Sequence, residues 1–169
     1  MKRLLFDAYV RIKQLFWTVL AKRKIAVHQG GVKCNYKCVF NRNTYLGSNC
    51  NFNGLTIYGS GKVSIGNNFH SGRNIQIITS YHNYDFGRAI PYDDTFITKD
   101  VTIGDNVWLG NSVIILGGAK IMDGAIIQAG SVVCGDIPRL AIAGGHPAKV
   151  FKYRNKDHYD ELERTKSYH

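Results

Sequence analysis

The chain has 169 residues, of which 44% are hydrophobic and 20% charged, a balance typical of one globular domain. Lysine and arginine outnumber the acidic residues by 22 to 12, and the resulting net charge of +10 favours an anionic partner. The basic residues gather in residues 2–24 and 149–166 rather than along the whole body among aromatic side chains, which argues against a nucleic-acid-binding protein.

Residues 1–24 are expected to form an N-terminal amphipathic helix. Residues 2–22 lack Gly and Pro, and their apolar positions 5, 9, 12, 16 and 19 fall on one helical face. The charges of Asp7, Arg11 and Lys13 interrupt the apolar positions, so we expect neither a cleavable signal nor a membrane span. Two roles stay open for this helix. It either caps the end of a β-structure or contacts another subunit, or it lies on an anionic membrane surface.

A period of six residues runs through most of the remaining chain. Between residues 33 and 82 it is ragged, with one inserted residue, and its members are Leu46, Phe52, Tyr58, Ile65, Ser71 and Ile77. It then becomes regular through Ile97, Ile103, Leu109, Ile115, Ile121, Ile127 and Val133. A helix repeats near every 3.6 residues and a strand every two, so neither structure sets this period.

The period of six indicates a coil of three short strands stacked on similar coils, which is the hexapeptide pattern of a parallel β-helix. Small or β-branched residues recur two places before each repeat start, as a narrow corner requires. We therefore predict a mainly β fold, with about five coils over residues 33–138. The flat outer faces of such a coil are poorly covered by the chain itself, so we expect a homotrimer.

Residues 83–96 break the period and are expected to form a loop that projects from the coil. They contain Gly87, Pro91 and three acidic residues. Loops on a rigid scaffold often carry binding and catalytic residues. His82 stands immediately before the loop, and histidine is well suited to accept a proton at neutral pH. His82 is therefore the candidate general base.

Residues 139–169 are expected to form a turn and a basic helical tail. The repeat ends near Pro138, and the cluster that follows consists of Lys149, Lys152, Arg154 and Lys156. A phosphorylated small molecule is a candidate partner for this cluster, and a solvated basic tail is the alternative.

No metal site is expected. The four cysteines, Cys34, Cys38, Cys50 and Cys134, form no zinc-binding spacing, and we expect free thiols in a reducing cytoplasm. A γ-class carbonic anhydrase on the same fold needs three histidines around zinc. His70 and His82 lie on different faces of the coil, and no third histidine joins either one.

Several motifs in this chain resemble those of the hexapeptide-repeat acyltransferases. They are the repeat itself, His82-x-x-Asp85, the stretch Ile-Gly-Asp-Asn-Val-Trp-Leu-Gly-Asn at 103–111, Gln-Ala-Gly-Ser at 128–131, Asp-Ile-Pro at 136–138 and Gly-His-Pro at 145–147. Within that family the chain is most similar to the galactoside, maltose and nodulation-type sugar O-acetyltransferases and their relatives in bacterial polysaccharide synthesis. The resemblance covers roughly residues 45–154.

The resemblance implies a trimer of left-handed β-helices, with acetyl-CoA along the coils and a sugar acceptor between subunits. By this resemblance His82 takes the proton from a sugar hydroxyl, and Asp85 is the candidate to orient its ring. Asn51 and Trp108 match acceptor-binding positions.

The resemblance also implies contacts with the acyl donor. Asn111 and Ala129 match positions that hold the pantetheine arm of acetyl-CoA, and Lys149 and Lys152 match basic residues near its nucleotide phosphates. The threonine and lysine common before Asp-Ile-Pro are Cys134 and Gly135 here, so one phosphate contact differs.

The implied function is acetylation of a sugar hydroxyl in surface polysaccharide or glycoconjugate synthesis, in the cytoplasm or at the inner face of its membrane. The acidic acceptor residue of the galactoside and maltose enzymes falls near Ser60 and is missing, so a different acceptor is expected. Two alternatives remain: an N-acetyltransferase acting on a nucleotide-linked amino sugar, and a non-catalytic β-helical scaffold.

Overall fold

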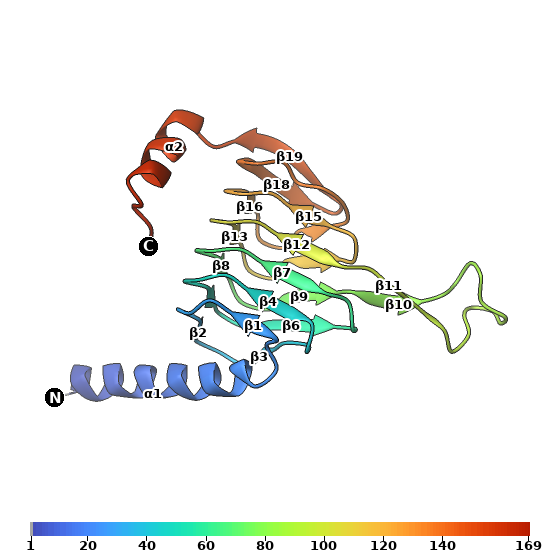
Figure 1. Ribbon diagram of the computed structural model, residues 1–169, viewed down its shortest axis with the longest axis horizontal. Helices are drawn as coiled ribbons and strands as arrows, with labels where there is room; N and C mark the ends of the chain where they lie inside the picture. The colour runs from blue at the N-terminus through green and yellow to red at the C-terminus, as the bar shows by residue number, and fades with distance from the viewer. Residues whose placement is uncertain (1) are drawn as a thin grey trace.

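The computed structural model describes residues 2–169, so Met1 of the predicted N-terminal segment lies outside the described residues. Helix α1 (Lys2–Lys22) lies beneath one end of a stack of short strands, and helix α2 (Lys156–Arg164) lies near the other end (Figure 1). Both helices occur where the sequence predicts them. Within the described chain, neither helix combines the length and the apolar character needed to cross a bilayer.

Three sheets run along the stack. Sheet A contains β1 (Val27–His28), β4 (Thr44–Leu46), β7 (Val63–Ile65), β12 (Val101–Ile103) and β15 (Lys120–Ile121). Sheet B contains β2 (Lys33–Cys34), β5 (Asn51–Phe52), β8 (His70–Ser71), β13 (Trp108–Leu109), β16 (Ile126–Ile127), β18 (Ala141–Gly145) and β19 (Ala148–Tyr153). Sheet C contains β3 (Cys38–Val39), β6 (Leu55–Tyr58), β9 (Ile75–Ile78), β14 (Ile114–Leu116) and β17 (Val132–Val133).

The chain passes through sheets A, B and C in turn, so that each circuit is one coil of a parallel β-helix. Neighbouring strands pair in parallel throughout the three sheets, except that β19 folds back antiparallel on β18. Five complete coils are followed by a partial sixth turn, in which Ile137 bridges Ile121 and β18 pairs with β16. The predicted mainly β fold of about five coils is confirmed.

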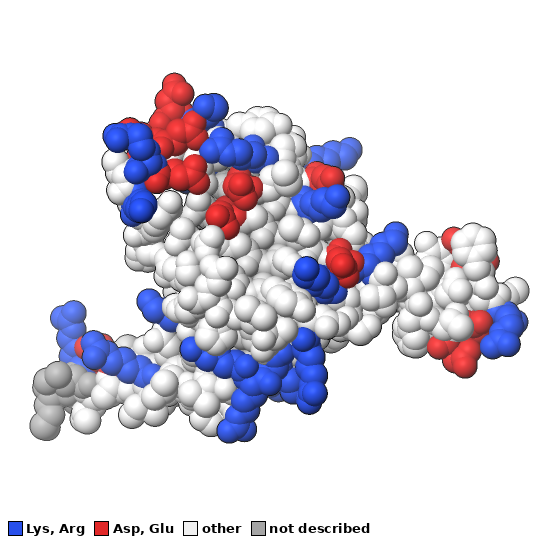
Figure 2. Space-filling view, in the orientation of Figure 1, with Lys and Arg blue, Asp and Glu red and all other residues white. Residues whose placement is uncertain are grey.

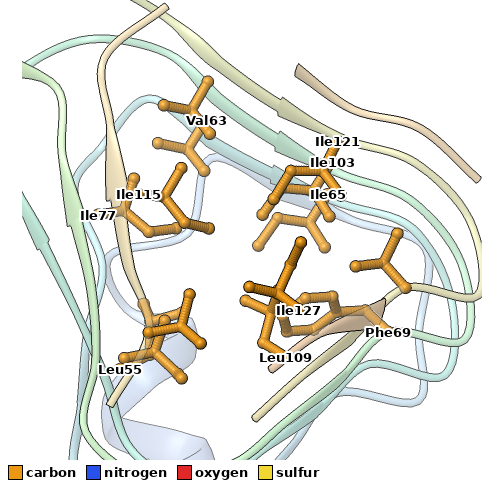
Figure 3. Packing of buried hydrophobic residues seen from close by; sticks show 14 of the residues in the cluster. Leu55, Val63, Ile65, Phe69, Ile77, Ile103, Leu109, Ile115, Ile121 and Ile127 are labelled. Carbon is orange, nitrogen blue, oxygen red and sulfur yellow. The ribbon is translucent and has the colours of Figure 1, made fainter. Parts of the chain in front are cut away.

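The core consists of aliphatic residues stacked in rows inside the coil, as Figure 3 shows. In sheet A the register places Ile103 between Ile65 and Ile121, and in sheet C it places Ile115 between Ile77 and Val133. The side chains of these rows are at most 3% exposed. The period of six arises because each side of the coil contributes one inward residue to its row.

Two members of the predicted period are wrong. Tyr58 is 49% exposed, and Leu55 and Ile57 fill the inward positions of β6 instead, because the inward residue Ile57 follows Phe52 after five residues and not six. Ile97 lies outside the coil in β11 (Phe96–Thr98), where it is paired with Tyr81.

A ladder of asparagines at one corner of the coil connects it to α2. Asn49, Asn68 and Asn106 have φ values of 55°, 52° and 58°, a left-handed conformation that Asn tolerates better than most residues. The Nδ2 of Asn49 donates to Oδ1 of Asn68 at 3.0 Å, and the Nδ2 of Asn68 donates to Oδ1 of Asn106 at 2.9 Å. The Nδ2 of Asn106 donates to the hydroxyl of Tyr159 at 2.8 Å and thereby fixes α2 over the coil.

A two-stranded arm interrupts the stack between sheets C and A. Strand β10 (Ser80–His82) pairs antiparallel with β11, and Figure 1 shows the arm projecting well beyond the coil. Its outer loop is organised by Asp93, whose carboxylate accepts the backbone N–H of Arg88 at 2.8 Å and that of Thr95 at 2.9 Å. The predicted excursion at about 83–96 is therefore a hairpin with an ordered tip.

Candidate active site

The imidazole of His82 lies at the base of the arm among aromatic rings. It stacks on Tyr92 with ring centroids 3.7 Å apart and an interplanar angle of 15°, and Phe96 lies 4.5 Å from it. Its Nδ1 is buried and has no hydrogen-bond partner among the described residues. These stacking contacts hold the ring in one orientation and leave Nε2 as the nitrogen open to a proton donor.

The predicted orienting residue, Asp85, does not contact that nitrogen within the chain. Asp85 is exposed on the outer loop, and Nδ1 of His82 is unpartnered in the described structure. The carboxylate that shapes the arm is Asp93. The Thr95 hydroxyl and the backbone N–H groups of Arg88 and Thr95 donate to it and lower its pKa. Deprotonated Asp93 is thus built into the loop that carries Tyr92.

The predicted acceptor residues lie together on the outer face of sheet B. Asn51 and His70 are in register across β5 and β8, and Trp108 is in register with His70 on the next strand. Trp108 is 55% exposed, and the Oδ1 of Asn51 accepts a hydrogen bond from Asn35 at 3.0 Å. The three side chains form one outward row.

Above this row, α2 and the C-terminal residues enclose a pocket of about 470 Å³. Its walls include His70, Trp108, Ile126, Tyr159, Tyr168 and His169. Burial lowers the pKa of His70 and thereby favours the neutral form of its ring. An aromatic wall beside polar groups suits a small amphipathic molecule.

His70 lies on this face of the site and was not among the residues predicted to belong to it. A signal for it exists: Ile-Gly-Asn-Asn at 65–68 and Ile-Gly-Asp-Asn at 103–106 form the same corner of successive coils. Aligning the two corners places His70 beside Trp108, as the register confirms. Tyr168 and His169 could not be found in this way, because the tail lies outside the repeat.

The predicted donor-binding residues lie at the end of sheet B. Asn111 follows β13, where its Oδ1 accepts the backbone N–H of Arg73 at 2.7 Å. Ala129 follows β16 one coil further on, and its backbone groups make no hydrogen bond within the described chain. Lys149 and Lys152 lie on β19 opposite Gly144 and Ile142. Both lysines are exposed and form no ion pair with a described residue.

A single chain does not bring the two halves of the predicted site together. His82 lies on the arm, which leaves the coil between sheets C and A, whereas Asn51 and Trp108 lie on sheet B. In Figure 1 the arm points away from the side on which β8 and β13 lie. The predicted base, His82, and the predicted acceptor-binding row therefore lie on different sides of this chain.

Comparisons with known proteins give consistent matches. Residues 100–135 match the family model described as bacterial transferase hexapeptide (six repeats). A Saccharomyces cerevisiae protein provisionally named as an acetyltransferase is 39% identical over 118 residues, covering 69% of this chain and 59% of its own length. The chain thus spans less than two thirds of that relative.

Two solved structures share the fold. A hexapeptide-repeat-containing acetyltransferase from Vibrio cholerae, solved with acetyl-coenzyme A, has a TM-score of 0.66 at 25% identity, covering 82% of this chain and 76% of its own. A galactoside acetyltransferase in complex with coenzyme A has a TM-score of 0.67 at 28% identity, covering 83% of this chain and 71% of its own.

Proposed function

We propose that this chain is a hexapeptide-repeat acyltransferase and, within that family, an acetyl-CoA-dependent O-acetyltransferase that acts on a sugar hydroxyl in polysaccharide or glycoconjugate synthesis. The observation that carries the proposal is the fixed imidazole of His82 at the base of the arm. The similarity to two structures with bound acetyl-CoA or CoA supports the choice of donor. Because acetyl-CoA is a cytoplasmic metabolite, we infer that the reaction takes place in the cytoplasm.

In the proposed reaction, Nε2 of His82 accepts the proton of the sugar hydroxyl as the hydroxyl oxygen attacks the thioester carbonyl carbon. The C–S bond then breaks, and the proton held by the imidazole passes to the departing sulfur. The products are the acetyl ester and the free thiol of CoA. Because Tyr92 and Phe96 fix the ring, His82 loses little freedom when it takes part in the reaction.

The complete site is proposed to form between subunits of a trimer. The arm of one subunit would bring His82 to the sheet B face of its neighbour, which carries Asn51 and Trp108. The positions of the two halves of the site support this arrangement, since the arm with His82 leaves the coil between sheets C and A, whereas Asn51 and Trp108 lie on sheet B.

The donor is proposed to lie along the end of sheet B. The unpaired backbone groups of Ala129 suit the amide groups of a pantetheine arm, and Asn111 lies one coil below. Lys149 and Lys152 follow on the outermost strand. They are free to bind the phosphates of the nucleotide, because neither is engaged by an acidic residue of the described chain.

Replacing Lys149 and Lys152 together with alanine should raise the KM for acetyl-CoA by about tenfold or more and leave the KM for the acceptor nearly unchanged, since two charge-assisted contacts are lost. Initial rates at varied donor and acceptor concentrations measure this. The matched control is Lys62→Ala with Lys120→Ala, which removes two exposed lysines near sheet A. An equal rise in both KM values would contradict the assignment of the phosphate site.

A thiol-release assay with acetyl-CoA tests the proposed function itself. The purified chain is incubated with a panel of sugars, nucleotide-linked sugars and amino sugars, and the acetylated product is identified by mass spectrometry. We expect release of CoA that depends on a sugar hydroxyl and yields an acetyl ester. Acetylation of amines alone, or no release with any acceptor, would overturn the proposal.

A further inference from the structure

The apolar face of α1 points away from the coil. The helix touches the first coil mainly through Gln14, Trp17, Thr18 and Ala21, where the backbone N–H of Cys34 donates to the Thr18 hydroxyl at 2.9 Å, and at the edge of this contact the Nζ of Lys13 lies 4.1 Å from the ring centroid of Tyr36. On a helical wheel these residues occupy one side, and Leu5, Ile12, Phe16 and Val19 occupy the opposite side. These four side chains are between 48% and 68% exposed. An end cap would bury such a row, so α1 covers the coil with its other face.

Positive charge is concentrated at the same end of the molecule. The first 42 residues contain ten lysines and arginines and one acidic residue, a net charge of +9. Residues 43–169 contain twelve lysines and arginines and eleven acidic residues, a net charge of +1. Figure 2 shows basic side chains gathered along α1 and beneath the N-terminal end of the coil, with almost no acidic residues beside them. The ion pairs among the described residues all involve residues from Arg88 onward.

The charges of α1 lie at the flanks of its apolar face. By helical spacing, Arg11 and Lys22 fall on one flank and Lys13 on the other, each roughly a quarter turn from the apolar row. Long basic side chains at such positions reach lipid headgroups while the apolar row enters the headgroup and acyl boundary.

We propose that α1 and the N-terminal end of the β-helix dock onto an anionic lipid bilayer, with α1 in the plane of the surface and the coils standing above it. The net charge of this end of the molecule favours an anionic bilayer over a second copy of this chain as the partner of the surface. A second copy would bring another +9 against the first, whereas an anionic bilayer neutralises it. This inference concerns a surface separate from His82 and does not rest on the proposed function.

Vesicle sedimentation with the full chain tests the proposal. Vesicles of equal parts phosphatidylcholine and phosphatidylglycerol are compared with vesicles of phosphatidylcholine alone. We expect binding to the anionic vesicles, at least about tenfold weaker binding to the neutral ones, and loss of binding as salt is raised. Protein that remains in the supernatant with anionic vesicles at low salt would overturn the proposal.

Two sets of variants separate the apolar and the electrostatic contributions. The double variant Ile12→Ser, Phe16→Ser should bind anionic vesicles at least about tenfold more weakly than the wild type. Its control is the double variant Tyr58→Ser, Met122→Ser, which alters two exposed apolar residues on the coil. Lys22→Gln, Arg23→Gln and Lys24→Gln should also weaken binding and reduce its salt dependence. The charge control is Lys62→Gln, Lys120→Gln and Lys166→Gln.

The oligomeric state tests the alternative that a second copy of this chain covers the apolar face of α1. Analytical ultracentrifugation without lipid should give the same mass for the wild type and for the Ile12→Ser, Phe16→Ser variant. If that variant dissociates and still binds anionic vesicles as tightly as the wild type, the apolar face is a contact between copies and the proposal is wrong.

Discussion

Replacing His82 with alanine is expected to lower kcat for acetyl transfer by about 10²–10⁴-fold, the range typical for removal of a general base. The KM for acetyl-CoA should change little, because the proposed donor contacts lie on sheet B and not on the arm. The imidazole packs against Tyr92 and Phe96 at the base of the arm and takes no part in the core rows, so the coil should remain folded. Steady-state kinetics and thermal unfolding of the variant measure the two effects.

His28→Ala is the matched control for this experiment. His28 is exposed on β1 in the first coil, outside the proposed site, so its replacement should leave kcat within about twofold of wild type by the same reasoning. If His82→Ala retained wild-type turnover, the arm would not supply the base. If it lost the folded coil, a second variant, His82→Gln, would keep the size of the side chain while removing the base.

The arrangement of the coil was predictable because its period is a direct consequence of its geometry. Each side of a coil places one large aliphatic residue at the same inward position, so Ile103, Leu109 and Ile115 reveal three sides and one complete turn. The prediction failed where the chain departs from six residues a side. Tyr58 occupies a repeat position but points outward, because the inward residue Ile57 follows Phe52 after five residues and not six.

The extent of α1 was likewise predictable, but its environment was not. A stretch without Gly or Pro that carries Leu5, Ile12 and Phe16 on one face specifies an amphipathic helix. The pattern does not specify what covers that face. The polar Gln14 and Thr18 make hydrogen bonds with the coil, and no hydrophobic period identifies them in advance.

The candidate site likewise contains residues that the sequence points to and contacts that it does not reveal. His82 could be proposed from the sequence because it stands where the repeat breaks, and Trp108 because the motif around it resembles that of the hexapeptide-repeat acyltransferases. The stack of His82 on Tyr92 depends on how the loop folds back through Asp93, which is a tertiary arrangement without a sequence period. Asp85, three residues from His82, was expected near the imidazole and instead faces solvent.

Replacing Leu109 with alanine is expected to lower the free energy of unfolding by about 2–5 kcal/mol, the range for buried Leu→Ala changes. Leu109 is fully buried on β13 in the fourth coil, in register with Ser71 below and Ile127 above. In a stack where each coil packs only on its neighbours, a cavity at this position weakens two coil–coil contacts at once. Chemical denaturation at fixed protein concentration measures the loss.

Met122→Ala provides the control, because it removes a side chain of similar size that is 51% exposed on the outside of the coil. Its cost should stay within about 0.5 kcal/mol. Equal costs for the two variants would mean that the stacked rows do not carry the stability of the coil. A large cost for Leu109→Ala alone would mean that the stacked rows carry the stability of the coil. The strands on either side of the arm, β9 and β12, belong to this same stack.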